Sequence, residues 1–167
     1  MLKAARKTAK ATHAVHQQNM VWTEIKAENF VVTDDDLNVG ENMYKGIDLE
    51  SAVPVGEFPL DFTTKSIPPE FAREYTCGRE ATAKMEYSFD VWSLGMLLYK
   101  LAVGEHYFSG LDDFCITRSL STMEEVNLDN VHLQNNPQLK DLVGQCLQVN
   151  PDDRPSMDEV LAHPYFN

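Results

Sequence analysis

Four polar residues near the start of the chain have the types and spacing that transfer of a phosphoryl group requires. Glu24, Lys26 and Asn29 follow one another closely, and Asp48 lies 19 positions after Asn29. A carboxylate can accept a proton from a hydroxyl group, and an ammonium can offset the charge of a phosphate. An amide and a carboxylate together can hold Mg²⁺. Such groups must converge, so we expect the flanking elements to bring them together.

A helix is predicted before these residues, over residues 1–18, because small or apolar residues recur on one face and lysines on another. The predicted inner face consists of Ala4, Thr8, Ala11 and Val15. Strand-like runs at 29–33 and 43–47 indicate a small hairpin around three successive aspartates at 34–36. This acidic run lacks the alternating ligands and distal glutamate of a calcium loop, so calcium is not favoured there.

A long loop is predicted over residues 51–86, because six proline and glycine residues interrupt any regular period. Loops of this length in compact domains are often functional. Residues 89–103, which follow it, are apolar on nearly every side, with Ser88 as the expected N-cap. A helix of this kind is buried all round, so other helices must surround it.

Two later helices are predicted from their caps. Asn136 and Pro137 open one, and Ser156 with Glu159 forms a capping box for the last, which is expected to end near residue 163. The expected fold class is therefore mainly α, with helices packed around a buried central helix and a small β-hairpin beside them.

The composition excludes several classes of function. The 167 residues carry 14 basic and 26 acidic side chains, a formal net charge of −12. An acidic surface repels phosphate backbones, so no nucleic-acid partner is expected, whereas basic peptides are compatible with it. No apolar stretch approaches the roughly 18 residues that span a bilayer, so no membrane partner is expected. Three scattered cysteines favour neither a disulfide framework nor a zinc site, and a cytoplasmic protein is expected, with the nucleus as the alternative.

Several short segments, in order along the chain, resemble those of the C-terminal lobe of eukaryotic protein kinases. Residues 22–29 look like the catalytic loop, usually written H-R-D-L-K-x-x-N, and 48–50 look like D-F-G. Residues 68–70 stand where A-P-E is expected. Residues 90–95 match the start of the family's central helix, and 153–156 match the segment before its last helix.

This resemblance implies a protein kinase domain over residues 1–167, present as a C-lobe fragment. Its expected parts are the helix at 1–18, the catalytic loop at 22–29, the activation segment at 48–70 and the helical subdomain at 88–167. The glycine-rich loop and lysine-bearing strand of the family's N-lobe are not found in it. The N-lobe is therefore expected to be absent from this sequence and to be a missing partner in cis.

The resemblance also implies a role for each matching site residue. Asn29 and Asp48 would bind Mg²⁺ and with it ATP, Lys26 would contact the transferred phosphate of ATP, and Glu24 occupies the position of the catalytic base. Lys26 together with Thr63, which lies in the substrate loop, is similar to the serine/threonine class rather than the tyrosine class.

Three further residues match positions with structural roles. Glu70 and Arg154 would form an ion pair that joins the long loop to the helical core, a bidentate task that suits a planar guanidinium. Asp90 would accept backbone hydrogen bonds from the catalytic loop. Trp22 and Leu49 replace the histidine and phenylalanine that normally pack together, so we expect this pair to be repacked jointly.

Three substitutions depart from the family's pattern. Glu24 replaces aspartate, which moves the carboxylate outward by about 1.5 Å, and a misplacement of about 1 Å can cost on the order of 10²-fold in rate. Thr23 replaces the arginine that reads a phosphorylated loop, and Glu50 replaces a glycine.

Two functions follow from the resemblance and its departures. The first is transfer of the γ-phosphoryl of ATP to serine or threonine hydroxyls of a protein substrate in an intact parent, with the fragment alone inactive. The alternative is a pseudokinase scaffold or interaction module that binds a partner protein without catalysis.

Overall fold

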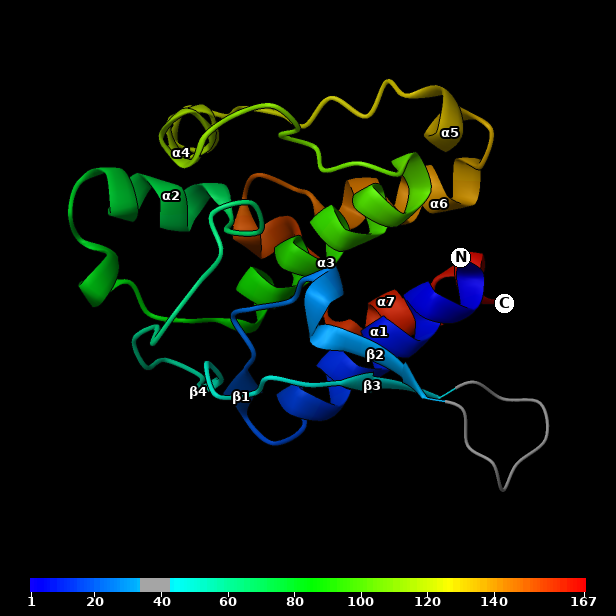
Figure 1. The fold of residues 1–167 in the computed structure, drawn as a ribbon, viewed down its shortest axis with the longest axis horizontal. Coiled ribbons are helices and arrows are strands. Elements are labelled where there is room, and N and C mark those ends of the chain that lie inside the picture. Colours follow the sequence, from blue (N-terminus) through cyan, green and yellow to red (C-terminus); the bar gives the residue numbers. More distant parts are fainter. Residues whose placement is uncertain (34–42) are drawn as a thin grey trace.

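The computed structural model describes residues 1–33 and 43–167, and helices dominate it (Figure 1). The α-helices are α1 (Leu2–His16), α2 (Pro69–Thr76), α3 (Tyr87–Val103), α4 (Asp113–Ser121), α5 (Val131–Gln134), α6 (Pro137–Cys146) and α7 (Met157–Ala162). The 3₁₀ helices are η1 (Ala27–Asn29), η2 (Glu80–Thr82), η3 (Pro151–Asp153) and η4 (Pro164–Phe166). The strands are β1 (Met20–Val21), β2 (Phe30–Thr33), β3 (Met43–Gly46) and β4 (Val53–Pro54).

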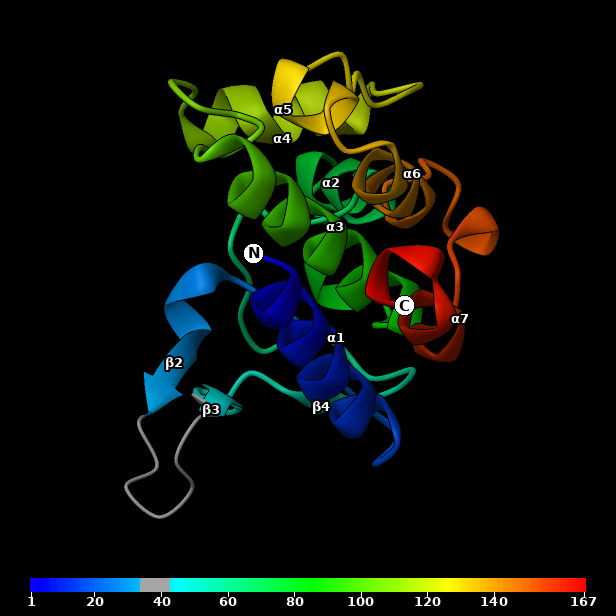
Figure 2. The ribbon, with the colours of Figure 1, turned by 90° about the vertical axis from the view of Figure 1, so that its right-hand side faces the viewer.

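Helix α3 is the centre of the molecule, as predicted. Residues 89–98 are all buried, because α1, α5 and α6 pack around the helix from different sides (Figure 2). The helix ends at Gly104, whose φ of 90° places it in the left-handed region that glycine adopts without strain. The predicted N-cap at Ser88 is wrong: the cap position is Glu86, and Ser88 lies in the first turn.

Helix α1 occupies most of the predicted range but buries a different face. The buried residues are Ala5, Thr8, Ala9 and Thr12, so only Thr8 of the predicted inner face is fully buried. Alanine and threonine recur all round this helix, so the sequence gives little contrast between its faces. The packing of α1 against α7, β3 and α3 decides which face is buried.

The segment predicted as one long loop contains regular structure, so this prediction is wrong in part. It includes β4, η2 and helix α2. Pro69 stands at the first turn of α2 after an extended Pro68, so prolines that interrupt a pattern here begin a helix. Helix α2 packs against α4, which was not predicted, and its Phe71 meets Phe62 and Phe89 in edge-to-face contacts.

Two small antiparallel sheets position the segments that follow α1. Strand β2 pairs with β3 in the predicted hairpin, with Phe30 opposite Gly46. The aspartates at 34–36 lie outside the described residues. Strand β1 pairs with β4, with Val21 opposite Val53, so residues 22–26 leave the sheet beside residues 47–52.

The two C-terminal helices begin where their caps predict. The side chain of Asn136 accepts a hydrogen bond from the backbone N–H of Leu139 at the start of α6. Ser156 and Glu159 form the predicted capping box of α7. None of the described helices is both long and apolar enough to cross a bilayer.

Candidate active site

The loop that follows β1 is anchored on the central helix through one carboxylate. Asp90 on α3 is fully buried and accepts hydrogen bonds from the backbone N–H groups of Trp22 at 2.7 Å and Thr23 at 2.9 Å. Nε2 of His16, in the last turn of α1, lies 2.9 Å from the same carboxylate. Sequence reasoning missed His16, because a single histidine at a helix end carries no signal for a contact 74 residues away. The start of the loop is therefore fixed to the core.

Thr23 turns the loop and ties it to the segment after Asp48. Its φ is 67°, a left-handed conformation that is uncommon and strained for a β-branched residue. Its hydroxyl lies 3.1 Å from the backbone carbonyl of Ser51, and the indole N–H of Trp22 donates to the carbonyl of Asp48 at 3.1 Å. The two segments predicted to carry the chemistry are thus held side by side.

Three of the predicted residues meet at one atom. Oε1 of Glu24 accepts hydrogen bonds from Nζ of Lys26 at 2.8 Å and from the hydroxyl of Thr63 at 2.7 Å. Nζ of Lys26 also lies 3.4 Å from the Thr63 hydroxyl. Glu24 is only 7% exposed, so little water competes for its carboxylate. A carboxylate, an ammonium and a hydroxyl group therefore share one contact point.

Asn29 is joined to this cluster through the backbone. Its side-chain Nδ2 donates to the carbonyl of Glu24 at 3.0 Å, which leaves Oδ1 as its free acceptor within the described residues. The backbone N–H of Ile47 donates to the carbonyl of Asn29 at 2.9 Å, so β3 delivers the neighbouring Asp48 to the same end of the hairpin. Asp48 is exposed and has a φ of 60°. The hydrogen bonds of the described residues include none between the side chains of Asn29 and Asp48.

Glu70 and Arg154 form a bidentate ion pair away from this cluster. Both guanidinium-to-carboxylate distances are 2.7 Å, and the Arg154 side chain has no exposed surface. The guanidinium carbon lies 5.0 Å from the ring centre of Trp92 on α3. This pair attaches α2 to the central helix, and in the described part of the chain none of its hydrogen bonds reaches Glu24, Lys26 or Thr63.

Trp22 and Leu49, which were expected to pack together, differ in burial. Trp22 is fully buried against Phe30, with ring centres 5.2 Å apart, whereas Leu49 is 49% exposed. Both line an apolar groove of about 460 Å³ beside α1.

A family model described as protein kinase domain matches residues 1–166. The chain belongs to the protein kinase family. This kinase chain is 29% identical over 169 residues to the dual specificity protein kinase Ttk of Danio rerio, covering 96% of the chain and 16% of that protein. It is 27% identical over 159 residues to the Aurora kinase of Schizosaccharomyces pombe, covering 95% of the chain and 41% of that protein.

A solved structure has the same fold. The twitchin kinase region from C. elegans superposes with a TM-score of 0.80 at 24% identity, covering 99% of this kinase chain and 28% of the twitchin chain. The predicted kinase-like, mainly α fold is therefore confirmed. The chain spans between 16% and 41% of the length of the two relatives named above.

Proposed function

We propose that this chain is the C-lobe of a serine/threonine protein kinase, in which Glu24 accepts the proton of a substrate hydroxyl as the γ-phosphoryl of ATP is transferred to it. The observation that carries this proposal is the meeting of Lys26 and Thr63 at one oxygen of Glu24. A base, a cation and the loop that would hold the substrate then act at one place. In this C-lobe, residues 22–29 would be the catalytic loop and residues 48–70 the activation segment, between the helix at 1–18 and the helical subdomain at 88–167.

The chain's own residues would position the substrate hydroxyl and neutralise charge on the phosphoryl group. The Thr63 hydroxyl already donates to Oε1 of Glu24, so a substrate serine or threonine offers that atom the same kind of donor. Lys26, with its ammonium 2.8 Å from Glu24, would orient the carboxylate and offset charge on a neighbouring phosphoryl group. Because Glu24 is almost fully buried, these interactions act with little competition from solvent.

Asn29 and Asp48 would hold Mg²⁺. The chemistry of the donor set fits, since Oδ1 of Asn29 and the exposed carboxylate of Asp48 are the hard oxygen ligands that Mg²⁺ prefers. Bound Mg-ATP would supply the phosphoryl group with part of its charge neutralised. The role of Asn29 is then twofold, because its Nδ2 also fixes the backbone of Glu24.

One observation favours a second function, a pseudokinase scaffold that binds a partner protein without transfer. Oε1 of Glu24 already accepts two hydrogen bonds, and its side chain is one methylene longer than that of aspartate. Thr63 must release this oxygen before a substrate hydroxyl can reach it, which opposes catalysis.

Phosphate transfer from radiolabelled ATP to a serine peptide distinguishes the two functions. The protein tested joins this chain to the N-lobe of a related kinase, and the 167-residue chain alone is expected to be inactive. Glu24→Asp is expected to raise the rate by up to about 10²-fold. Asp48→Ala is expected to abolish transfer, and Asp152→Ala, an exposed acid on η3, to leave it unchanged. The same background rate in the unmutated two-lobe protein and in its three variants would refute the kinase function and support the scaffold function.

A further inference from the structure

A cleft next to the Glu24 cluster is lined by more lysines than acids, although the chain as a whole is acidic. It has a volume of about 550 Å³, within the usual range for ligand pockets, and both Lys26 and Thr63 line it. Its other walls come from η1, the segment before α2, the second half of α3, and the start of α4. Any peptide that presents a hydroxyl to Glu24 must therefore pass beside it.

The ionisable groups that line the cleft are mainly basic. They are Lys26, Lys65, Lys100 and His106, against the acids Glu28 and Asp113. This excess is notable in a chain whose formal net charge is −12. The three lysines outnumber the two acids, and because Lys26 and Lys100 already hold Glu24 and Glu28, Lys65 supplies the remaining positive charge.

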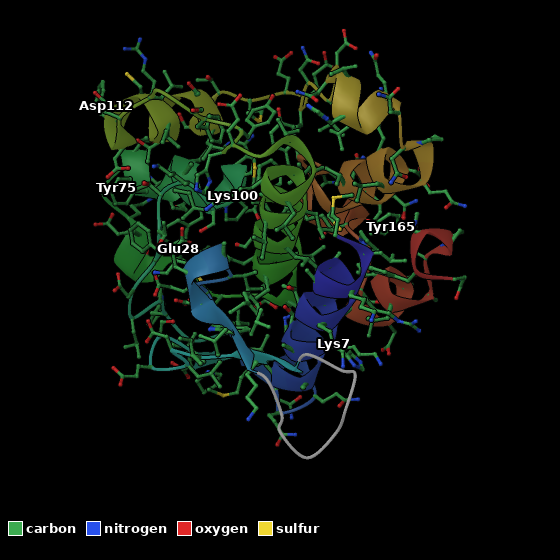
Figure 3. All side chains as sticks on the ribbon, turned by 45° about the vertical axis from the view of Figure 1, so that its right-hand side comes forward. Lys7, Glu28, Tyr75, Lys100, Asp112 and Tyr165 are labelled. Atoms are coloured by element: carbon green, nitrogen blue, oxygen red, sulfur yellow. The ribbon has the colours of Figure 1, made fainter. Side chains whose placement is uncertain are left out.

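Both acids that line the cleft already have a hydrogen-bond partner, and for Glu28 this partner is a cation. Nζ of Lys100 donates to Glu28 at 3.1 Å, and the two residues lie side by side in Figure 3. The Asp113 carboxylate accepts a hydrogen bond from the Thr64 hydroxyl. Lys65, by contrast, is exposed and has no ion-pair partner among residues 1–33 and 43–167. A ligand anion would therefore find an unpaired ammonium here.

His106 lines the same cleft as Lys65 and Lys100. Burial lowers the pKa of His106 first, and the positive charges of Lys100 and Lys65 lower it further. Two lysines that lie 35 positions apart in the sequence thus act on one imidazole ring. The apolar floor of the cleft, from Phe62, Met96 and Leu97, reduces screening by water.

We propose that this cleft binds an anionic side chain of the protein substrate, a carboxylate or a phosphate monoester, through the unpaired ammonium of Lys65, with Lys100, which also holds Glu28, and His106 lining the same cleft. The proposal rests on the function proposed above, because it places this side chain on the same peptide as the hydroxyl that reaches Glu24. It reverses the preference for basic peptides that the overall charge suggests. Selection of the substrate would then follow local charge rather than net charge.

Binding of fluorescein-labelled peptides to the 167-residue chain, measured by anisotropy without ATP, tests the proposal. The peptides carry one serine and differ at a single flanking residue, which is glutamate, phosphoserine, glutamine or lysine and is moved through the positions on both sides. At the best position the glutamate peptide is expected to bind about fivefold more tightly than the glutamine peptide. Phosphoserine, with nearly twice the charge, would bind more tightly still if phosphate is the preferred anion, and equally or less tightly if carboxylate is.

Variants of the lysines locate the effect. Lys65→Glu combined with Lys100→Gln is expected to remove the preference for glutamate, whereas Lys84→Glu combined with Lys140→Gln makes the same charge change outside the cleft and should preserve it. If loss of the Lys100–Glu28 pair disturbs folding, Lys65→Glu alone serves as the test variant, because the Lys65 side chain is exposed and this change leaves that pair in place. The NMR-detected pKa of His106 should rise when the glutamate peptide binds, because a nearby anion favours the imidazolium.

Three results would overturn the proposal: no saturable binding of the glutamate peptide, equal affinity for glutamate and glutamine peptides at every position, or an equal loss in the control variant. Its failure is distinguishable from that of the proposed function. Charge-selective binding without phosphate transfer in the two-lobe protein would leave the anion site standing and remove the kinase activity. Phosphate transfer without charge-selective binding would support the kinase activity and remove the anion site.

Discussion

Replacement of Arg154 by methionine should destabilise the whole domain. The guanidinium makes five hydrogen bonds, two to Glu70 and three to the backbone carbonyls of Gln148, Ser88 and Val149. Its removal leaves the Glu70 carboxylate and three carbonyls without their partner. Breaking a buried ion pair costs about 3–5 kcal/mol, and we take the lower end because the Glu70 side chain is 32% exposed. For a domain of this size, about 3 kcal/mol corresponds to a fall in Tm of about 10 °C.

Thermal unfolding followed by circular dichroism measures this effect, and the chain offers a matched control. Arg79 and Glu74 form a similar bidentate pair, with distances of 2.7 and 3.2 Å, but the Arg79 side chain is 56% exposed. Arg79→Met is therefore expected to leave Tm nearly unchanged, since water and salt screen an exposed pair. The Tm of Arg154→Lys should lie between those of Arg154→Met and the unmutated protein. Lysine keeps the positive charge but lacks the planar pair of N–H donors that binds both carboxylate oxygens. Equal shifts for Arg154→Met and Arg79→Met would refute the claim that burial gives the first pair its importance.

Three further measurements address the core, the free thiols and one helix cap. Gly95→Ala should cost about 1–3 kcal/mol in urea unfolding, because its Cβ would lie 2.7 Å from Leu147, whereas Gly144→Ala, with its nearest contact at 3.5 Å, should be tolerated; the reverse order would contradict this. Cys77 should react most quickly with a thiol reagent at pH 8, Cys115 more slowly because its hydrogen bond to Asp112 raises its pKa, and Cys146 most slowly because burial raises its pKa to about 12; a fast Cys146 would show that its site is open. The N-cap backbone N–H of α7 lowers the pKa of Glu159, so its stabilisation is present above the ordinary carboxyl pKa and is lost as pH falls through the lowered value. Glu159→Gln should therefore lower Tm near pH 7 but not near pH 3, and an equal effect at both pH values would exclude this cause.

Local signals in the sequence predict the C-terminal helices well. Asn136 and Ser156 cap helices through their own side chains, so the signal and its effect lie within three residues. The same kind of reasoning fails where the decisive interaction is distant. Pro69 could either break or begin a helix, and the packing of α2 on α4 decides between the two.

The candidate site was predictable in its members but not in its contacts. The order of motifs indicated Glu24, Lys26 and Thr63 together, although Thr63 lies 39 positions from Glu24. Nothing local to His16 indicated its contact with Asp90, and nothing local to Lys65 indicated that it shares a cleft with Lys100. These contacts depend on tertiary packing, which the spacing along the chain does not encode.

The anchoring of residues 22 and 23 on Asp90 has a consequence for their protection from solvent. Their N–H groups belong to a connecting loop, and loop amides usually exchange with deuterium through small local openings. Here the acceptor is a carboxylate with no exposed surface on the central helix, so opening either hydrogen bond would leave a buried charge without its donor and costs more than opening a solvated loop. The two amide protons should therefore persist in D₂O as long as those in the middle of α3, and their lifetime would report on global unfolding.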